Sequence, residues 1–217
     1  MMDLAAMRGQ LATALLSDVL DALGWRNQAL PSRIRPLDEA AVLAGRARTA
    51  LFMDVYEVVP DENPYALEIA LVDSLRKDEV PVFACGATGR IAPWGELLST
   101  AAQVRGAAGA LMDGMVRDVR AIRAMGFPVF HGGIGPLDSK GRGKIVAIDV
   151  PVEVAGVRIV PGDLVFGDVD GVIVVPQAVE AEALAAAAEK LAGERTTLAE
   201  LRQGAKLGEV FAKYGIL

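Results

Sequence analysis

The feature that most restricts the fold is the alternation of short apolar runs with segments of helical periodicity in the middle of the chain. Residues 80–84 and 108–113 are apolar runs of strand length. Each is followed by a stretch whose apolar residues recur at helical spacing, at 95–105 and 118–125. Short apolar runs of this kind are typical of strands buried on both faces of a parallel sheet. The alternation therefore predicts an α/β domain.

The remaining expected elements extend this pattern towards both ends of the chain. They are a helix at 13–24, a strand at 41–52, a helix at 63–75, a glycine-bearing loop at 86–90, a strand at 127–130, short β segments with turns within 144–176, and a long helix at 177–203. No linker, internal repeat or low-complexity tract separates these elements. We therefore expect one domain across the 217 residues.

Hydrophobic residues make up 53% of the chain, which is high for a protein outside the membrane. The apolar runs are nevertheless short, such as residues 172–175, whereas a membrane helix needs about 18 or more apolar residues in succession. We expect no membrane association, and a cytoplasmic location, because the N-terminus lacks a basic-then-apolar signal pattern. The excess of apolar residues favours a homo-oligomer. The single cysteine, Cys85, excludes an internal disulfide.

The charged residues limit the partners and the metals that the protein could bind. The net charge of −6 argues against nucleic acid, which requires a basic face. His131 is the only histidine, so one chain cannot supply the several His or Cys ligands of a typical zinc site. Any metal would be held by oxygen atoms, which points to Mg²⁺ or Mn²⁺.

Three polar residues lie where two expected helices begin, just after the carboxyl ends of two expected strands. Glu96 falls in the first turn of one helix, and Arg117 and Asp118 lead into the other. Ligands of open α/β sheets gather at such places, and helix N-termini attract carboxylates. An arginine can bind an oxyanion through two parallel hydrogen bonds, and an aspartate can be the lone protein ligand of Mg²⁺. Ordinary helix capping by Asp118 and Glu96 explains the same pattern equally well.

A longer stretch resembles a known family. The sequence WGELLSTAAQVRGAAGALMDGMVRD, residues 94–118, is similar to the core of the RraA-like family, which includes 4-hydroxy-4-methyl-2-oxoglutarate aldolases and regulators of ribonuclease activity A. The resemblance continues in GFPVF at 126–130, VRIVPGD at 157–163 and GDVDGVIVVP at 167–176. It covers nearly the whole chain.

The resemblance implies a fold and an assembly. The fold would be a three-layer β/β/α swivelling-type domain, and the protein would form trimers or hexamers with active sites between subunits. The C-terminal helix from about residue 177 would pack at a subunit interface. The family's aldolases also take an acidic residue from a neighbouring subunit, for which Glu194 is the first candidate here and Glu209 the second.

The resemblance also implies site residues and roles. The family's aldolases carry an acidic residue, twenty intervening residues and then Arg-Asp, which Glu96, Arg117 and Asp118 match. Asp118 would bind Mg²⁺ or Mn²⁺, and Arg117 would stabilise an enolate oxygen. Glu96 would orient or deprotonate a metal-bound water molecule, although the family's acid is often Asp. The backbone of Gly95, Glu96, Leu97 and Leu98 would hold the carboxylate of a small 2-oxo acid.

The expected activity is a divalent-metal-dependent retro-aldol cleavage of 4-hydroxy-4-methyl-2-oxoglutarate or related 4-hydroxy-2-oxo acids to pyruvate. Oxaloacetate decarboxylation would accompany it, because both reactions leave a pyruvate enolate. The alternative is a protein-binding regulator of ribonuclease activity without catalysis. A hydroxy-acid enzyme with another substrate is a third possibility, since Glu96 departs from the commoner Asp. His131 and Cys85 are expected to be structural.

Overall fold

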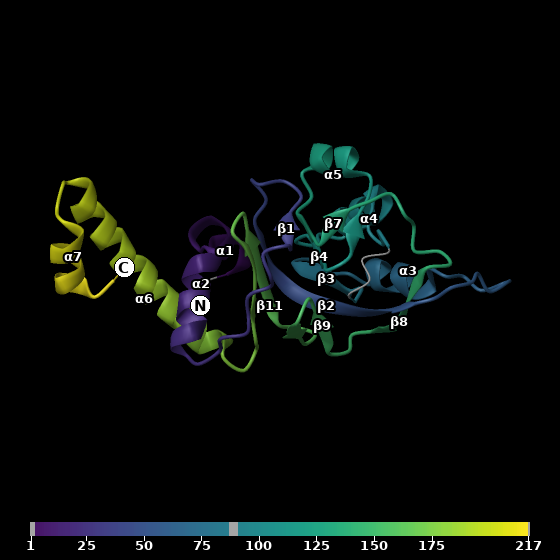
Figure 1. Ribbon diagram of the computed structural model, residues 1–217, viewed down its shortest axis with the longest axis horizontal. Coiled ribbons are helices and arrows are strands. Elements are labelled where there is room, and N and C mark those ends of the chain that lie inside the picture. The colour runs from purple at the N-terminus through teal and green to yellow at the C-terminus, as the bar shows by residue number, and fades with distance from the viewer. Residues whose placement is uncertain (1–2, 87–90, 217) are drawn as a thin grey trace.

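The computed structural model describes residues 3–86 and 91–216, so most of the expected loop 86–90 lies outside the described residues. Eight strands form a mixed sheet in the order β1-β6-β4-β3-β2-β11-β12, and β8 also pairs with β2 (Figure 1). These strands are β1 (Arg35–Pro36), β2 (Leu43–Asp54), β3 (Glu79–Ala84), β4 (Ala110–Met112), β6 (Val129–His131), β8 (Gly143–Ile148), β11 (Leu164–Asp168) and β12 (Gly171–Val175). No helix among the described residues is long and apolar enough to cross a membrane.

One half of the sheet is parallel and carries helices on one face. Strands β2, β3, β4 and β6 are parallel neighbours, as the strand–helix alternation predicted. The helices that connect them are α3 (Ala66–Asp73), α4 (Glu96–Val104) and α5 (Val119–Met125). Phe83 of β3 packs beneath them with Trp94 and Ile122, all buried. The expected strands and helices of this half are confirmed.

The other face of the same strands is covered by a hairpin, β9 (Val152–Val154) and β10 (Val157–Ile159). Successive side chains of a strand point to opposite faces, so Val82 leaves the core under the helices and packs with Val154 and Ile159 of the hairpin. The molecule thus has the expected three layers: hairpin, sheet and helices.

The antiparallel half of the sheet, β2 with β11 and β12, packs against α1 (Leu4–Gln10), α2 (Thr13–Ala22) and the first part of α6 (Glu180–Arg202). Helix α6 then extends away from the body and ends beside α7 (Leu207–Tyr214), as Figure 1 shows at its left. The sequence did not predict α1 or α7. Both are short, and α7 is held by contacts of Lys213 and Tyr214 with Glu200 that its own periodicity cannot reveal.

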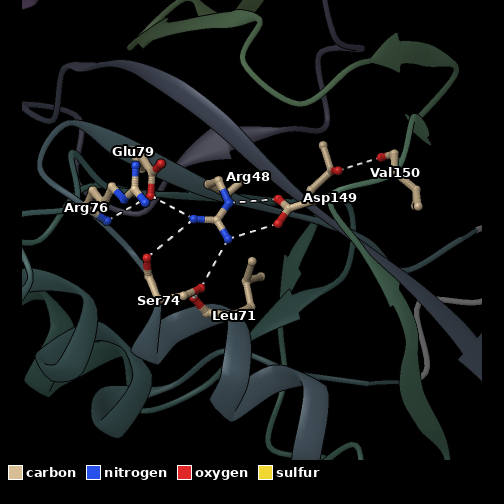
Figure 2. A network of polar contacts seen from close by, with 8 residues as sticks. Arg48, Leu71, Ser74, Arg76, Glu79, Asp149 and Val150 are labelled. Carbon is tan, nitrogen blue, oxygen red and sulfur yellow. Dashed lines mark hydrogen bonds and ion pairs between the residues drawn. The ribbon is translucent and has the colours of Figure 1, made fainter.

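A network around Arg48 fixes the end of α3 to the sheet (Figure 2). Its guanidinium donates two hydrogen bonds to Asp149, of 2.7 and 3.0 Å, and one to Glu79 of 3.0 Å. A further hydrogen bond of 3.1 Å reaches the Ser74 hydroxyl at the C-terminus of α3. A cation at this end of a helix is favourable because the last carbonyls carry partial negative charge. The network therefore holds α3 in place from β2.

Candidate active site

The loops that follow β3, β4 and β6 are joined by backbone hydrogen bonds. Strand β5 (Met115–Val116) pairs in parallel with β7 (Gly133–Ile134), and Val116 also forms a bridge with Trp94. The Arg117 amide donates to the Trp94 carbonyl at 2.9 Å. Trp94 is fully buried, with its indole N–H bonded to Ser99, so this junction is anchored in the core. The beginnings of α4 and α5 therefore lie side by side.

Asp118 adopts a conformation in which its side chain contacts α4 and not its own helix, α5. Its φ of 57° and ψ of 33° lie in the left-handed region, which residues other than glycine seldom occupy. The side chain makes no capping hydrogen bond to α5. Instead, its Oδ2 accepts a hydrogen bond of 3.1 Å from the Glu96 amide, the first of α4. The capping of its own helix that the sequence equally allowed is wrong, and the carboxylate faces the N-terminus of the neighbouring helix.

Gly95 makes this close approach possible. A Cβ atom at residue 95 would lie 2.5 Å from Asp118 Oδ2 and 3.2 Å from Arg117 Cγ. The first distance is shorter than any van der Waals contact allows, so a side chain here would displace the carboxylate. Gly95, Arg117 and Asp118 together form what we call the backbone wall of the site.

The backbone wall lines a pocket of about 310 Å³. Its lining comprises Tyr65, Glu68, Ile69, Pro93, Gly95, Leu97, Leu98, Arg117, Asp118 and Asp138. Five of the predicted site residues, Gly95, Leu97, Leu98, Arg117 and Asp118, are thus brought together. The side chain of Glu96 is exposed and is not part of the lining, although its amide contacts Asp118. Its role with water stays a prediction.

The pocket is also lined by three polar residues that the sequence analysis missed. We call Tyr65, Glu68 and Asp138 the carboxyl wall. Asp138 Oδ1 lies 3.1 Å from Arg117 Nη2, and its Oδ2 accepts a hydrogen bond from the Tyr65 hydroxyl. Burial raises the pKa of Asp138, but this hydrogen bond, backbone amides and Arg117 outweigh it, so the pKa lies below its ordinary value. Asp138 is therefore an ionised partner that orients Arg117.

The Arg117 guanidinium has one N–H donor that a ligand could use. Its Nε is buried and has no hydrogen-bond partner among the described residues. A buried donor without a partner costs about 1–3 kcal/mol, and a bound oxyanion would satisfy it. The amides of Leu97 and Leu98 lie in the first turn of α4. They lack intrahelical acceptors because no preceding turn supplies carbonyl groups to them. The pocket thus offers several donors to an anionic ligand.

Glu68 is the most buried charged residue of the pocket, with 5% of its surface exposed. Burial, and then the nearby negative charge of Asp138, raise its pKa to about 8, while Arg117 acts in the opposite sense. Its signal in the sequence was an acid flanked by apolar residues inside the helix segment ALEIALVD, whose other acid, Asp73, stands at the end. Asp138 had no such signal, because it lies in a polar turn.

The expected metal fits Asp118 only as a single-carboxylate site. The described residues contain no group of three or more His, Cys, Asp or Glu side chains that could hold a metal ion. Asp118 engages one carboxylate oxygen with the Glu96 amide, and among the described residues its Oδ1 accepts no hydrogen bond. Mg²⁺ is commonly bound by one or two carboxylates, with water and substrate completing its shell. The residues present are compatible with that arrangement.

The other candidates lie away from the pocket. Glu194 is on α6 and Glu209 on α7, in the part of the chain that extends from the body, and neither lines the pocket of its own chain. His131 is buried in β6, where it lies opposite Arg35 of β1 in the antiparallel strand pair, and burial lowers the pKa of its imidazole. Cys85 is buried after β3.

A larger cavity of about 360 Å³ lies along the segment 53–64. Apolar residues such as Val58 and Val59 dominate its lining, and two of its three charged members, Glu62 and Lys144, pair with each other at 2.6 Å. It lacks the two helix N-termini and the arginine of the smaller pocket. The pocket beside Asp118 is therefore the candidate site.

The fold and the pocket together define a three-layer α/β protein with a pocket where two adjacent helices, α4 and α5, begin. A sequence profile described as RraA-like, Aldolase/RraA, matches residues 13–174. The chain belongs to this family.

Relatives and solved structures agree with this assignment. A Halalkalibacterium halodurans protein named "Putative 4-hydroxy-4-methyl-2-oxoglutarate aldolase" is 36% identical over 184 residues, covering 85% of this chain and 81% of the relative. A Thermus thermophilus protein named "4-hydroxy-4-methyl-2-oxoglutarate aldolase" is 30% identical, and the match covers 69% of this chain and 85% of the relative. The crystal structure of Streptomyces coelicolor RraAS2, described as an unusual member of the RNase ES inhibitor RraA family, superposes with a TM-score of 0.76 at 26% identity, covering 93% and 96% of the two chains.

Proposed function

We propose that the protein is a divalent-metal-dependent carbon–carbon lyase. Its substrate would be 4-hydroxy-4-methyl-2-oxoglutarate or a related 4-hydroxy-2-oxo acid, cleaved to pyruvate, and it would also decarboxylate oxaloacetate. The observation that carries the proposal is the backbone wall, in which Gly95 lets the Asp118 carboxylate and the Arg117 guanidinium meet at the N-terminus of α4. Two relatives that bear the aldolase name support the reaction class.

The residues of the pocket suggest how the substrate is held. The substrate carboxylate would accept hydrogen bonds from the first-turn amides of α4 at Leu97 and Leu98, where the helix dipole favours negative charge. Arg117 would donate its unpartnered Nε–H to the oxygen that becomes negative as the carbon–carbon bond breaks. Asp138 holds the guanidinium for this task.

Asp118 would hold Mg²⁺ or Mn²⁺. When bound, the ion supplies Lewis-acid polarisation of the 2-keto group. Glu96 is the first residue of α4 and its side chain is exposed. It would accept the proton of the substrate's hydroxyl group through a water molecule. A carboxylate from a neighbouring subunit, Glu194 or Glu209, would complete the site in the proposed trimer or hexamer. The C-terminal helix α6 would pack at that subunit interface.

The test is pyruvate release by the purified protein. The two substrates are 4-hydroxy-4-methyl-2-oxoglutarate and oxaloacetate, each with Mg²⁺ and with Mn²⁺, with pyruvate measured by coupled reduction to lactate. Activity is expected with metal and is expected to disappear after chelation and to return on re-addition. No pyruvate above the uncatalysed rate from either substrate with either metal would refute the proposal.

The second candidate is a regulator that binds a ribonuclease, favoured by the structural similarity to RraAS2 and by the net charge of −6. An acidic oligomer could cover a basic RNA-binding surface. Binding to an RNase E-type ribonuclease at moderate salt, with no pyruvate release, would favour this function over the lyase.

A further inference from the structure

We infer that Glu68 is the catalytic acid that delivers a proton to carbon 3 of the pyruvate enolate. The inference rests on the proposed function, because it assigns a further step of that reaction to a residue of the same pocket. Glu68 lies on α3, is buried, and lines the same pocket as Arg117 and Asp118. A carboxyl group in the same pocket as the proposed donor to the enolate oxygen can supply a proton to the neighbouring enolate carbon.

The surroundings of Glu68 favour its neutral form. Among the described residues, the ionisable groups near it are Tyr65 just before α3, Asp138 after β7 and Cys85 after β3. Arg117 is the cation that acts on it. Arg117 is already paired with Asp138 at 3.1 Å, so its charge is shared. The pKa of Glu68 is raised to about 8, so the carboxyl group holds a proton at neutral pH. A general acid works best when its pKa lies close to the working pH.

Glu68 would act after the carbon–carbon bond has broken. Glu96, through a water molecule, removes the proton of the substrate's C4 hydroxyl group. The C3–C4 bond then breaks, and its electron pair forms the enolate of pyruvate. The enolate then reforms its C2 carbonyl as the Glu68 O–H bond breaks and the proton forms a C3–H bond. The Glu68 carboxylate regains a proton from solvent through the open side of the pocket.

The reverse of this step can be measured with pyruvate alone. In D₂O with Mg²⁺, the Glu68 carboxylate would take a methyl proton from bound pyruvate and return a deuteron, which proton NMR detects. The Glu68→Gln variant keeps the shape but cannot exchange a proton, so deuterium incorporation is expected to fall about 100-fold or more. Substrate cleavage is expected to fall less than about tenfold, because the enolate can still leave and take its proton from water. Glu153→Gln, an exposed position on β9, is the matched control.

Two measurements guard against misfolding of the variant. In the wild-type protein, deuterium incorporation should rise with pH through about 8, because abstraction needs the carboxylate form. Without metal, infrared spectra at pH 6 should show a protonated carboxyl band that Glu68→Gln lacks.

The outcomes are distinct. Wild-type protein that cleaves substrate, with exchange unchanged in Glu68→Gln or flat across pH 6–9.5, would overturn the role of Glu68 and leave the lyase standing. Wild-type protein that neither cleaves nor exchanges would overturn both.

Discussion

The two walls of the pocket differ in how the chain builds them. The backbone wall is fixed by hydrogen bonds from main-chain amides: the Arg117 amide donates to the Trp94 carbonyl, and the Glu96 amide donates to the Asp118 carboxylate. The carboxyl wall depends on side chains far apart in sequence, such as Tyr65 and Asp138, which are 73 residues apart. Hydrogen bonds with main-chain amides suit residues that must hold charge at a fixed position, whereas a side-chain network suits the adjustment of charge and protonation. Substitutions in the backbone wall should therefore have the larger effects.

Arg117→Ala is expected to have the largest effect. It removes the donor proposed for the enolate oxygen, and loss of one such donor lowers kcat about 100- to 1,000-fold. Steady-state kinetics of pyruvate release measure this loss, and circular dichroism checks the fold. Arg120→Ala, an exposed arginine of α5, is the control and should keep wild-type kinetics. A kcat within about threefold of wild type in Arg117→Ala would remove the backbone wall from the mechanism.

Gly95→Ala is expected to come second. The added methyl group would lie 2.5 Å from Asp118 Oδ2, so the carboxylate must move, and a displacement near 1 Å can lower the rate about 100-fold. The apparent affinity for Mg²⁺ should weaken in parallel, as titration of activity against metal concentration would show. Gly9→Ala, where a Cβ meets nothing within 4 Å, is the matched control. If Gly95→Ala retains full activity and metal affinity, the close approach has no functional importance.

Asp138→Asn should have the smallest effect of the three. The amide keeps the size of the carboxylate and can still accept a hydrogen bond, but it removes the charge that orients Arg117. We expect kcat to fall about tenfold, as for the loss of a charge-assisted contact. The pKa of Glu68 should also fall, because Asp138 is one cause of its elevation. The pH dependence of deuterium incorporation would then shift to lower pH. An unchanged pH profile would show that Asp138 does not control the protonation of Glu68.

Much of this architecture could be predicted from local patterns. The strands and helices between residues 80 and 130 were predictable because the strands are short apolar runs and the helices have strong apolar periodicity. The family resemblance then supplied roles for Arg117 and Asp118, and the pocket contains both. The conformation of Asp118 was not predictable, because a side chain that caps its own helix and one that faces a neighbouring helix have the same sequence pattern.

The carboxyl wall was missed for a different reason. Its contacts are long-range, and neither a tyrosine before a helix nor an aspartate in a turn has a pattern that marks it as functional. Glu68 was the exception, since an acid within an apolar helix is unusual and indicates either a buried partner or a chemical role. Buried acids in apolar helices should be given the same weight as conventional motifs when such sequences are interpreted.

The left-handed backbone of Asp118 also limits how this position can vary. Only glycine, asparagine and aspartate adopt that region readily, so few residues can occupy position 118 without disturbing the junction of the two loops. Asparagine would keep the backbone and the shape while it removes the negative charge that a cation needs. A single conservative replacement could therefore separate the scaffold from its chemistry, which gives a family of this fold a short route between catalytic and non-catalytic members.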